Sequence, residues 1–330
     1  MQDIPVFIGG FRSGTTLLIN LLGLHPQITP WFETKELCEA LRWQRVLLHP
    51  EQAGFEAPYC ASEPPGFNLS AVHARMLFQI RATHARLAGT STSGKAAHER
   101  YPLGNDYVCY SQQEAEAALT VWHDAIANAG TISTLITITA TGNLIRTLGA
   151  LQHALHSPGR ATNAAWINKT PEISRFAPEL RTALGRCQII YVVRDGIDVV
   201  ASGLRLGWGS VEALAFNWKG LLERSRAAMQ GHEADYLELR YEQLVLEPEA
   251  TLERVLRFCG RMGQAAELVR LFSAQQGASA SSPFDTSRMQ GSKSLDAAQL
   301  RVFTAVAGDM QAALGYPSAS AALRRDKARE

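Results

Sequence analysis

The apolar positions of the chain predict short buried strands that alternate with helices. Residues 4–8 are apolar on both faces, as in a central strand of a parallel sheet, and the leucines that follow recur at helical spacing. Residues 187–193 form the clearest strand, and further strands are expected to end at Lys169 and near Arg240. This alternation indicates an α/β fold with a central parallel sheet of about five strands flanked by helices.

Between residues 38 and 165 the pattern changes to mostly helical periodicity. Prolines and polar residues separate the periodic stretches, which are Leu41–Leu48, Leu69–Leu87, Gln112–Asn128 and Thr134–His156. We therefore expect one domain over residues 1–330, with a large helical insertion at 38–165.

Composition narrows the class of protein. The chain is 46% hydrophobic and 19% charged, which is ordinary for a soluble core, and its net charge of +1 creates no field for nucleic acid. The five cysteines are scattered and never form a C-x-x-C pair, which favours reduced thiols over disulfides or a zinc site. The nine histidines show no metal-ligand spacing, so we expect no metal.

We expect a cytoplasmic protein without a membrane span. Residues 1–5 lead directly into the first strand and leave no room for a signal peptide. Residues 131–144 are uncharged, but they are too few and too rich in threonine to cross a bilayer.

The first strand runs into a glycine turn and a helix, and such a helix start binds anions. Backbone N–H groups from 13–16 and three hydroxyls would surround a phosphate-sized anion. The spacing of Gly9 and Gly14 is that of a nucleotide-hydrolysing P-loop, but Thr15 replaces its lysine and Arg12 supplies the cation. A purely structural turn and a P-loop kinase both remain open on this turn alone.

The run from Phe11 to Thr16 closely resembles the 5′-phosphosulfate loop of sulfotransferases that use PAPS (3′-phosphoadenosine 5′-phosphosulfate), most of all the tyrosylprotein branch. The resemblance implies a P-loop-like sulfotransferase fold, PAPS as donor, PAP as product and no metal. It implies that the cofactor is bound by Arg12, Ser13, Gly14, Thr15 and Thr16. That branch is membrane-anchored and lumenal in animals, so the expected lack of an anchor suggests a soluble bacterial relative.

Glu33 is the candidate general base. It follows Arg12 by 21 residues and opens the triplet Glu33-Thr34-Lys35, which resembles the base segment of the tyrosylprotein branch. The neighbouring Trp31 and Phe32 would desolvate its carboxylate and increase its affinity for a proton. The alternative is an acidic residue in the first turn of a helix, where it would stabilise the helix dipole.

Lys169 is the candidate cation at the leaving group. It stands at the carboxyl end of a predicted strand, where α/β sheets bind ligands. Its segment resembles the one whose lysine contacts the oxygen between phosphate and sulfate, where a cation offsets developing charge. In phenol and steroid sulfotransferases a catalytic histidine follows two residues later, but here Pro171 holds that place, which favours Glu33 as base.

Five further residues complete the implied site. Arg194, at a strand end, and Ser202, eight residues on, resemble the 3′-phosphate site, for which a forked guanidinium and a hydroxyl are suited. Tyr241 resembles a tyrosine of the nucleotide site. Ser287 and Lys293 keep the spacing of a serine and a lysine that touch the cofactor, and Ser287 would assist at the leaving oxygen, with Ser292 as its fallback.

The sequence therefore predicts sulfuryl transfer from PAPS to an acceptor hydroxyl. The resemblance suggests a tyrosine peptide as acceptor, but a small-molecule, sugar or lipid alcohol stays equally open. Two other functions also stay open: a P-loop kinase-like phosphotransferase and a catalytically inactive PAP-binding protein. A homodimer is neither required nor excluded.

Overall fold

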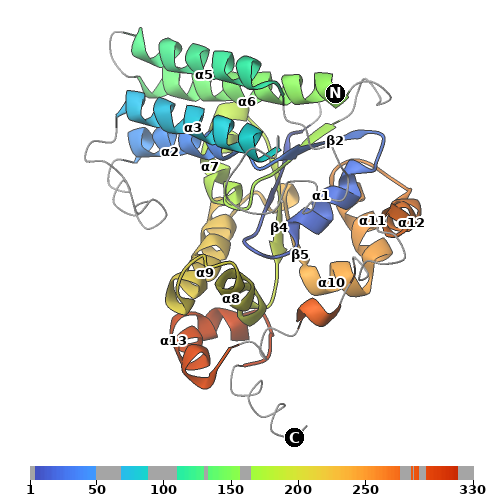
Figure 1. Ribbon diagram of the computed structural model, residues 1–330. Helices are drawn as coiled ribbons and strands as arrows, with labels where there is room; N and C mark the ends of the chain where they lie inside the picture. The colour runs from blue at the N-terminus through green and yellow to red at the C-terminus, as the bar shows by residue number, and fades with distance from the viewer. Residues whose placement is uncertain are drawn as a thin grey trace, which may run out of the picture. The chain divides into compact units, whose positions relative to one another are not determined.

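The computed structural model describes residues 4–49, 68–87, 110–129, 133–156, 165–275, 284, 286–289 and 295–318. Within these ranges five strands form one parallel sheet in the order β2-β3-β1-β4-β5 (Figure 1). The strands are β1 (Val6–Gly9), β2 (Ile28–Phe32), β3 (Ala165–Lys169), β4 (Gln188–Val193) and β5 (Tyr236–Arg240). The predicted α/β fold with about five parallel strands is confirmed.

The register of the sheet aligns strand ends that carry candidate residues. Phe32, the last residue of β2, lies opposite Lys169, the last residue of β3. Val193 at the end of β4 lies opposite Arg240 at the end of β5. The sequence pattern gave no strand at β2, which contains Pro30. Since β2 is at the edge of the sheet, a residue without an N–H is tolerated there.

The chain divides into two compact units, one from residues 1–7 and 23–188 and the other from 8–22 and 189–330. The first unit contains β2, β3 and the helices of the predicted insertion. These are α2 (Lys35–Leu48), α3 (Leu69–Leu87), α5 (Gln112–Ala127) and α6 (Thr134–His156), followed by η3 (Ile173–Phe176) and α7 (Ala177–Leu184).

The helices of the first unit pack in sequence order. Helix α2 packs against α3, α3 against α5, and α5 against α6, as the blue-to-green helices of Figure 1 show. Buried Arg45 of α2 binds Glu179 of α7 through two hydrogen bonds of 2.7 Å. The helical character of 38–165 is thus present in its described parts, whereas its role as a cover for the acceptor stays a prediction.

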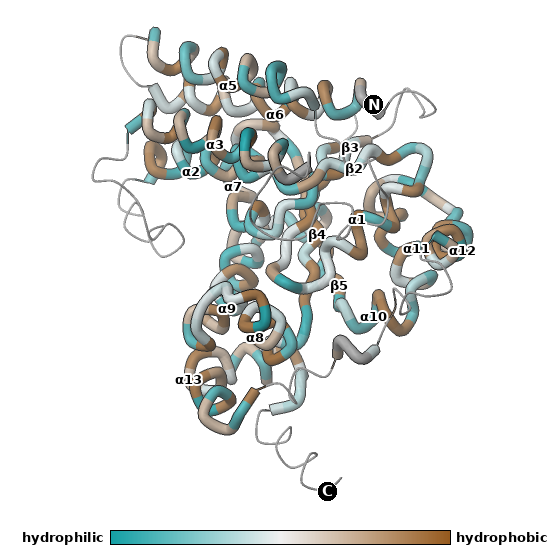
Figure 2. The backbone as a smooth tube through the Cα atoms, in the orientation of Figure 1, coloured by the Kyte–Doolittle hydropathy of each residue, from teal (hydrophilic) through white to brown (hydrophobic). Residues whose placement is uncertain are grey.

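The second unit contains β4, β5 and the helices that pack around them. Helix α1 (Thr15–Gly23) belongs to this unit up to residue 22. The other helices are α8 (Gly196–Arg205), α9 (Val211–Ala228), η4 (Glu233–Asp235), α10 (Tyr241–Leu246), α11 (Pro248–Phe258), α12 (Ala265–Gln275), η5 (Thr286–Met289) and α13 (Ala297–Ala313). Helices α8, α9 and α13 share one hydrophobic core, and Figure 2 shows brown segments on all three.

Gly196 starts α8 where no larger residue fits. A Cβ there would lie 2.8 Å from the rings of Trp218 and Phe303. This close packing fixes the position of Arg194, two residues earlier, at the end of β4. In the described part of the chain, no helix is long and apolar enough to cross a membrane.

Candidate functional site

Two glycines shape the turn after β1. Gly10 has φ 122°, and a Cβ there would lie 2.4 Å from the carbonyl oxygen of Val192. Gly14 has φ 83°, and a Cβ there would lie 2.3 Å from the ring of Tyr241. Only glycine combines such backbone angles with so close an approach. The turn is therefore held against both β4 and the start of α10.

Helix α1 begins directly after this turn, as predicted. The first helix residue is Thr15, and the amide of Leu18 donates to the carbonyl of Gly14 at 3.2 Å. Ser13 is buried and its hydroxyl donates to the carbonyl of Phe11 at 2.9 Å. Backbone N–H groups at the start of a helix have no intrahelical partners and favour an anion. The geometry suits a phosphate group, and the predicted roles of Ser13, Gly14, Thr15 and Thr16 stay predictions.

Arg12 reaches Ser202 in helix α8, which is distant in the sequence. Its Nε and Nη2 donate to Oγ of Ser202 at 3.1 and 3.0 Å. Its guanidinium carbon lies 5.0 Å from the ring centroid of Trp208, whose side chain is half-exposed. The structure thus brings together two residues that are 190 positions apart, both predicted to bind the cofactor.

Arg194 joins the same group of side chains. Its Nη1 donates to the carbonyl of Arg12 at 3.2 Å, and Nη2 lies 3.5 Å from the carboxylate of Asp198. Its guanidinium carbon lies 4.5 Å from the ring centroid of Tyr241. Arg12, Arg194, Ser202 and Tyr241, which we call the arginine cluster, are therefore assembled beside the glycine turn. Two guanidinium groups and a hydroxyl are ligands that phosphate prefers.

The late loop is described only in part. Ser287 lies in η5, which contacts α10, but its side chain is outside the described residues. Ser292 and Lys293 are outside the described residues altogether. Their predicted contacts with the cofactor stay predictions.

In the first unit, Glu33 and Lys169 form an ion pair. Nζ of Lys169 lies 2.8 Å from Oε1 of Glu33, and the amide of Glu33 donates to the carbonyl of Lys169 at 2.8 Å. The ammonium lies 3.8 Å from the ring centroid of Phe32. The side chain of Lys169 is 1% exposed and that of Glu33 is 26% exposed, so solvent reaches part of the Glu33 side chain and almost none of the Lys169 side chain.

Glu33 stands before helix α2 and not in its first turn. Helix α2 begins at Lys35, and Glu33 has φ 46°, which is uncommon for a residue other than glycine. Residues held in such conformations are concentrated at functional sites. The alternative role of a first-turn acid does not match this position.

A buried hydrogen-bond network fixes the backbone next to Glu33. The amide of Thr34 donates to Oγ1 of Thr170 at 2.9 Å, and Nδ2 of Asn168 donates to Oγ1 of Thr34 at 2.8 Å. Oγ1 of Thr170 donates to Oδ1 of Asn168 at 3.0 Å. No role is predicted for these three residues from the sequence. They flank both members of the ion pair, and that adjacency was the signal for them.

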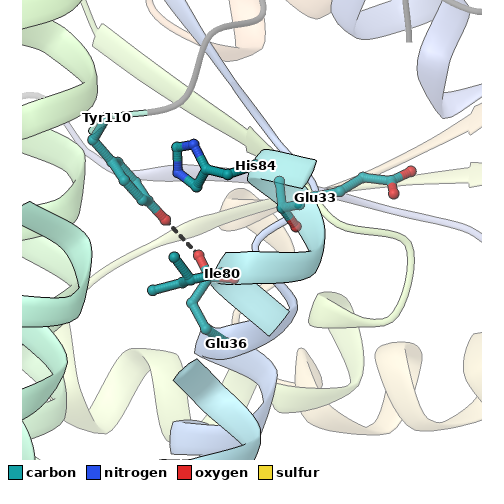
Figure 3. Close-up of a pocket in the computed structure, with 6 residues that line it drawn as sticks. Glu33, Glu36, Ile80, His84 and Tyr110 are labelled. Carbon is teal, nitrogen blue, oxygen red and sulfur yellow. Dashed lines mark hydrogen bonds between the residues drawn. The ribbon is translucent and has the colours of Figure 1, made fainter. Parts of the chain in front are cut away.

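Glu33 also lines a small pocket (Figure 3). The hydroxyl of Tyr110 donates to the carboxylate of Glu36 beside it. Among the described residues, no group of three or more His, Cys, Asp or Glu side chains could hold a metal ion.

Comparison with known proteins identifies one family and several distant structures. The sulfotransferase family matches residues 5–262. The sulfotransferase domain of the Synechococcus PCC 7002 olefin synthase is 14% identical, covering 96% of this chain and 97% of its own, with a TM-score of 0.45. Sulfotransferase STF9 from Mycobacterium avium is 13% identical, covering 92% and 76%, with a TM-score of 0.46.

Retinol dehydratase, solved with androsterone and inactive cofactor PAP, is 13% identical, covering 92% of this chain and 70% of its own, with a TM-score of 0.30. A search of curated proteins gives no match. These structural likenesses are too distant to carry an argument about function. The family match does not distinguish branches, so the tyrosylprotein branch stays a prediction.

Proposed function

Since the chain belongs to the sulfotransferase family, we propose that it transfers the sulfuryl group of PAPS to an acceptor hydroxyl, with Glu33 as general base. Sulfuryl transfer is the reaction of the family, while the donor, the base and the acceptor are our proposal. The observation that carries it is the arginine cluster beside the glycine turn, because a 3′,5′-bisphosphorylated nucleotide needs two anion-binding positions.

In this proposal the second unit binds the donor. The amides at the start of α1 hold the 5′-phosphosulfate, and Arg194 with Ser202 holds the 3′-phosphate. Tyr241, whose ring lies against Gly14 and Arg194, packs against the nucleotide. A bidentate guanidinium recognises phosphate by geometry as well as by charge, which distinguishes PAPS from nucleotides without a 3′-phosphate.

The first unit supplies the proton transfer. The carboxylate of Glu33 takes the proton of the acceptor hydroxyl while the acceptor oxygen forms a bond to sulfur, opposite the departing phosphate. The bond between sulfur and the bridging oxygen breaks, and its electron pair stays on that oxygen as part of PAP. Lys169 and Arg12 offset the charge there, and Ser287 assists.

The ion pair couples these steps. When Glu33 is protonated it no longer carries the charge that holds Nζ of Lys169 at 2.8 Å. The ammonium then becomes available to the leaving phosphate at the moment when negative charge develops there. One proton transfer would thus serve both the attacking and the leaving oxygen.

Two other functions make different predictions. A P-loop kinase requires ATP with magnesium, and Thr15 in the lysine position argues against it. An inactive PAP-binding protein would bind PAP without sulfating any acceptor. The presence of both Glu33 and Lys169, the proposed base and the proposed cation at the leaving group, argues against that.

Calorimetry with PAP and with ADP tests the proposed donor. We expect PAP to bind at least about 100-fold more tightly than ADP, since charge-assisted contacts to the 3′-phosphate are absent from ADP. Incubation with ³⁵S-labelled PAPS and a panel of alcohols and phenols then tests transfer. Equal affinity for ADP, or binding of ATP that depends on magnesium, would refute the proposal.

A further inference from the structure

Helix α13 lies after the part of the chain that matches the sulfotransferase family. That match ends at residue 262, whereas α13 begins at Ala297. The helix nevertheless packs against α8 and α9 (Figure 1), and the ring of its Phe303 limits the space at Gly196. It therefore belongs to the surroundings of Arg194, to which the proposed function assigns the 3′-phosphate.

Gln311 of α13 holds the turn between β4 and α8. Its side chain is buried, with 1% of the residue exposed. Oε1 accepts from the amide of Gly196 at 3.0 Å, and Nε2 donates to Oδ1 of Asp195 at 3.0 Å. Nε2 also donates to the carbonyl of Pro317 at 3.1 Å. Gln311 thus connects the two residues that follow Arg194 to the segment after α13.

Two other helices hold the same turn. Nε1 of Trp218 in α9 donates to the carbonyl of Arg194 at 3.2 Å. The amide of Asp195 donates to Oε1 of Glu242 in α10 at 3.0 Å. Together with Gln311, side chains of three helices therefore fix the backbone that carries Arg194, and these contacts do not involve its guanidinium.

The first amides of α8 already have acceptors within the protein. Oδ1 of Asp195 accepts from the amide of Ile197 at 2.8 Å, and Gln311 binds the amide of Gly196. A 3′-phosphate near this helix start is therefore bound through side chains rather than through these two amides. Its affinity then depends on where the turn places the guanidinium of Arg194.

The neutral amide group of Gln311 matches both of its partners in the turn. The amide of Gly196 needs an acceptor, and the carboxylate of Asp195 needs a donor. Burial raises the pKa of Asp195, and the hydrogen bond from Gln311 is the largest effect that opposes this, while the charge of Glu242 raises the pKa further. Gln311 thus favours the ionised form of Asp195, which caps α8.

We infer that Gln311 is a positioning residue for the donor: it fixes the place of Arg194 and thereby the preference for a nucleotide with a 3′-phosphate. The inference rests on the proposed function. In this role Gln311 acts through the backbone of Asp195 and Gly196, not by contact with the donor. A displaced guanidinium loses the geometry on which a bidentate contact with phosphate depends.

Calorimetry with PAP and AMP measures this preference, because the two nucleotides differ only in the 3′-phosphate. In Gln311→Leu we expect the ratio of PAP to AMP affinity to fall about tenfold, the effect of one weakened hydrogen bond to a charged group. AMP affinity should change less than about threefold. Leu300→Ala, which shortens a buried side chain of the same helix, should lower the melting temperature and keep the ratio. A wild-type ratio in Gln311→Leu overturns the inference.

Gln311→Glu adds a readout that a loss of stability alone would not produce. It places a further carboxylate beside that of Asp195, whose other acidic neighbour is Glu242. On the α9 side of the helix, Lys219 is paired with Asp309 at 2.6 Å. The charged and titratable groups around the turn are Arg194, Asp195, Asp198, Arg240, Glu242 and Tyr316.

The effect of Gln311→Glu should depend on pH. The ionised carboxylate repels Asp195 and Glu242, whereas its protonated form can donate to Asp195 as the amide does. We expect the ratio of PAP to AMP affinity to lie about tenfold below the wild-type ratio at pH 8 and to approach it at pH 5.5. Each value is compared with wild type at the same pH, because the 3′-phosphate itself titrates near pH 6.

Gln299→Glu is the matched control for this charge change. It introduces the same charge on α13, where a glutamate keeps the capping box with Asp296. Its ratio of PAP to AMP affinity should equal that of wild type at both pH values. If the ratio in Gln311→Glu also followed wild type at both pH values, the inference would be wrong.

A wild-type measurement decides the question if the variants do not fold. With a 3′-phosphate on Arg194, PAP should slow amide exchange in residues 310–317, and AMP should not. Equal exchange with the two nucleotides overturns the inference. If wild-type protein binds PAP no more tightly than AMP, the proposed donor site is wrong and the inference falls with it. If wild type prefers PAP and Gln311→Leu keeps that preference, only the inference is wrong.

Discussion

At the scale of single residues, the ion pair of Lys169 and Glu33 constrains the chemistry most. An ammonium that is 1% exposed requires a partner with opposite charge, since an unpaired buried charge is strongly destabilising. Glu33 provides that partner while keeping a quarter of its own side chain exposed. A carboxylate held this way is both accessible to an acceptor and linked to a cation.

Replacing Glu33 by Gln should abolish turnover and leave donor binding intact. The amide keeps the shape and a hydrogen-bond acceptor for Lys169, but it cannot take a proton. We expect kcat to fall by about 10²–10⁴-fold, the usual contribution of a general base, and PAP affinity measured by calorimetry to change less than about threefold. A variant that kept the wild-type rate would place the base elsewhere.

Ser202 should control the discrimination between PAP and ADP. Its hydroxyl contacts Arg12 at 3.0 Å and is our proposed ligand of the 3′-phosphate. We expect Ser202→Ala to weaken PAP binding by about tenfold, the effect of one lost hydrogen bond to a charged group, and to leave ADP binding unchanged.

Ser210→Ala is the matched control for Ser202. Its hydroxyl caps α9 by accepting from the amide of Ala213, so its loss should cost about 1 kcal/mol of stability. The ratio of PAP to ADP affinity should not change. A similar loss of PAP affinity in both variants would mean that Ser202 acts through stability alone.

At the scale of elements, the glycine turn between β1 and α1 determines where the donor binds. Gly14→Ala should move the ring of Tyr241, because a Cβ would lie 2.3 Å from it. We expect lower stability and a loss of PAP affinity by more than tenfold, since the amides of α1 and the arginine cluster would be displaced.

Gly185 offers a control with the same backbone cost. Its φ is 85°, close to the 83° of Gly14, and a Cβ there would meet nothing within 4 Å. Gly185→Ala should cost about 1–2 kcal/mol, the penalty of an L-residue in the left-handed region, and leave PAP binding unchanged. Urea unfolding together with calorimetry separates the two effects.

The packing of α3 against α5 should depend on pH. The rings of His73 and His123 stack at 4.6 Å between centroids, and the pKa of His73 lies below 6.5, first because of burial and second because of His123, with Asp124 opposing. Below pH 6.5 the unfolded chain binds a proton at His73 that the folded chain resists. The free energy of unfolding is therefore not reduced by His73 above pH 6.5, and it decreases as the pH falls below that value.

Urea unfolding between pH 7.5 and 5 measures this effect. We expect the urea concentration at the midpoint of unfolding to decrease in the wild type as the pH is lowered, and to decrease less in His73→Gln. His232→Gln, an exposed histidine of the second unit, should follow the wild type. An unchanged slope in His73→Gln would show that the stacked pair does not contribute.

The elements found from the sequence are those whose pattern is local. Strand β4 is apolar on both faces and was assigned within one residue, and the helices of 38–165 were recognised by periodicity. Strand β2 was not assigned, because Pro30 argues against a strand unless its place at the edge of the sheet is known. The arginine cluster was predicted only through a family resemblance.

Contacts between residues that are far apart in the chain could not be predicted from the sequence. Trp208 contacts Arg12 through its ring, and nothing in the sequence around Trp208 indicated this contact. The pairing of Tyr110 with Glu36 joins residues that are 74 positions apart. Such contacts require the fold, which composition and periodicity do not specify.

At the scale of the whole molecule, the proposed donor-binding residues and the proposed base belong to different compact units. Hydrogen exchange should therefore show where PAP acts. We expect PAP to slow amide exchange most at residues 10–18 and 194–204, which contain the glycine turn, the first turn of α1 and most of α8. Protection concentrated in α3 and α5 would contradict the assignment of the donor to the second unit.

The fluorescence of Trp208 can also report the binding of a ligand at Arg12. Of the six tryptophans, Trp31, Trp43, Trp122 and Trp218 are buried, whereas Trp208 is 53% exposed and stacks on Arg12. Iodide or acrylamide should quench the indole emission of Trp208 preferentially. Any ligand that draws the guanidinium of Arg12 away from that ring should change the emission, so occupancy could be followed without a label.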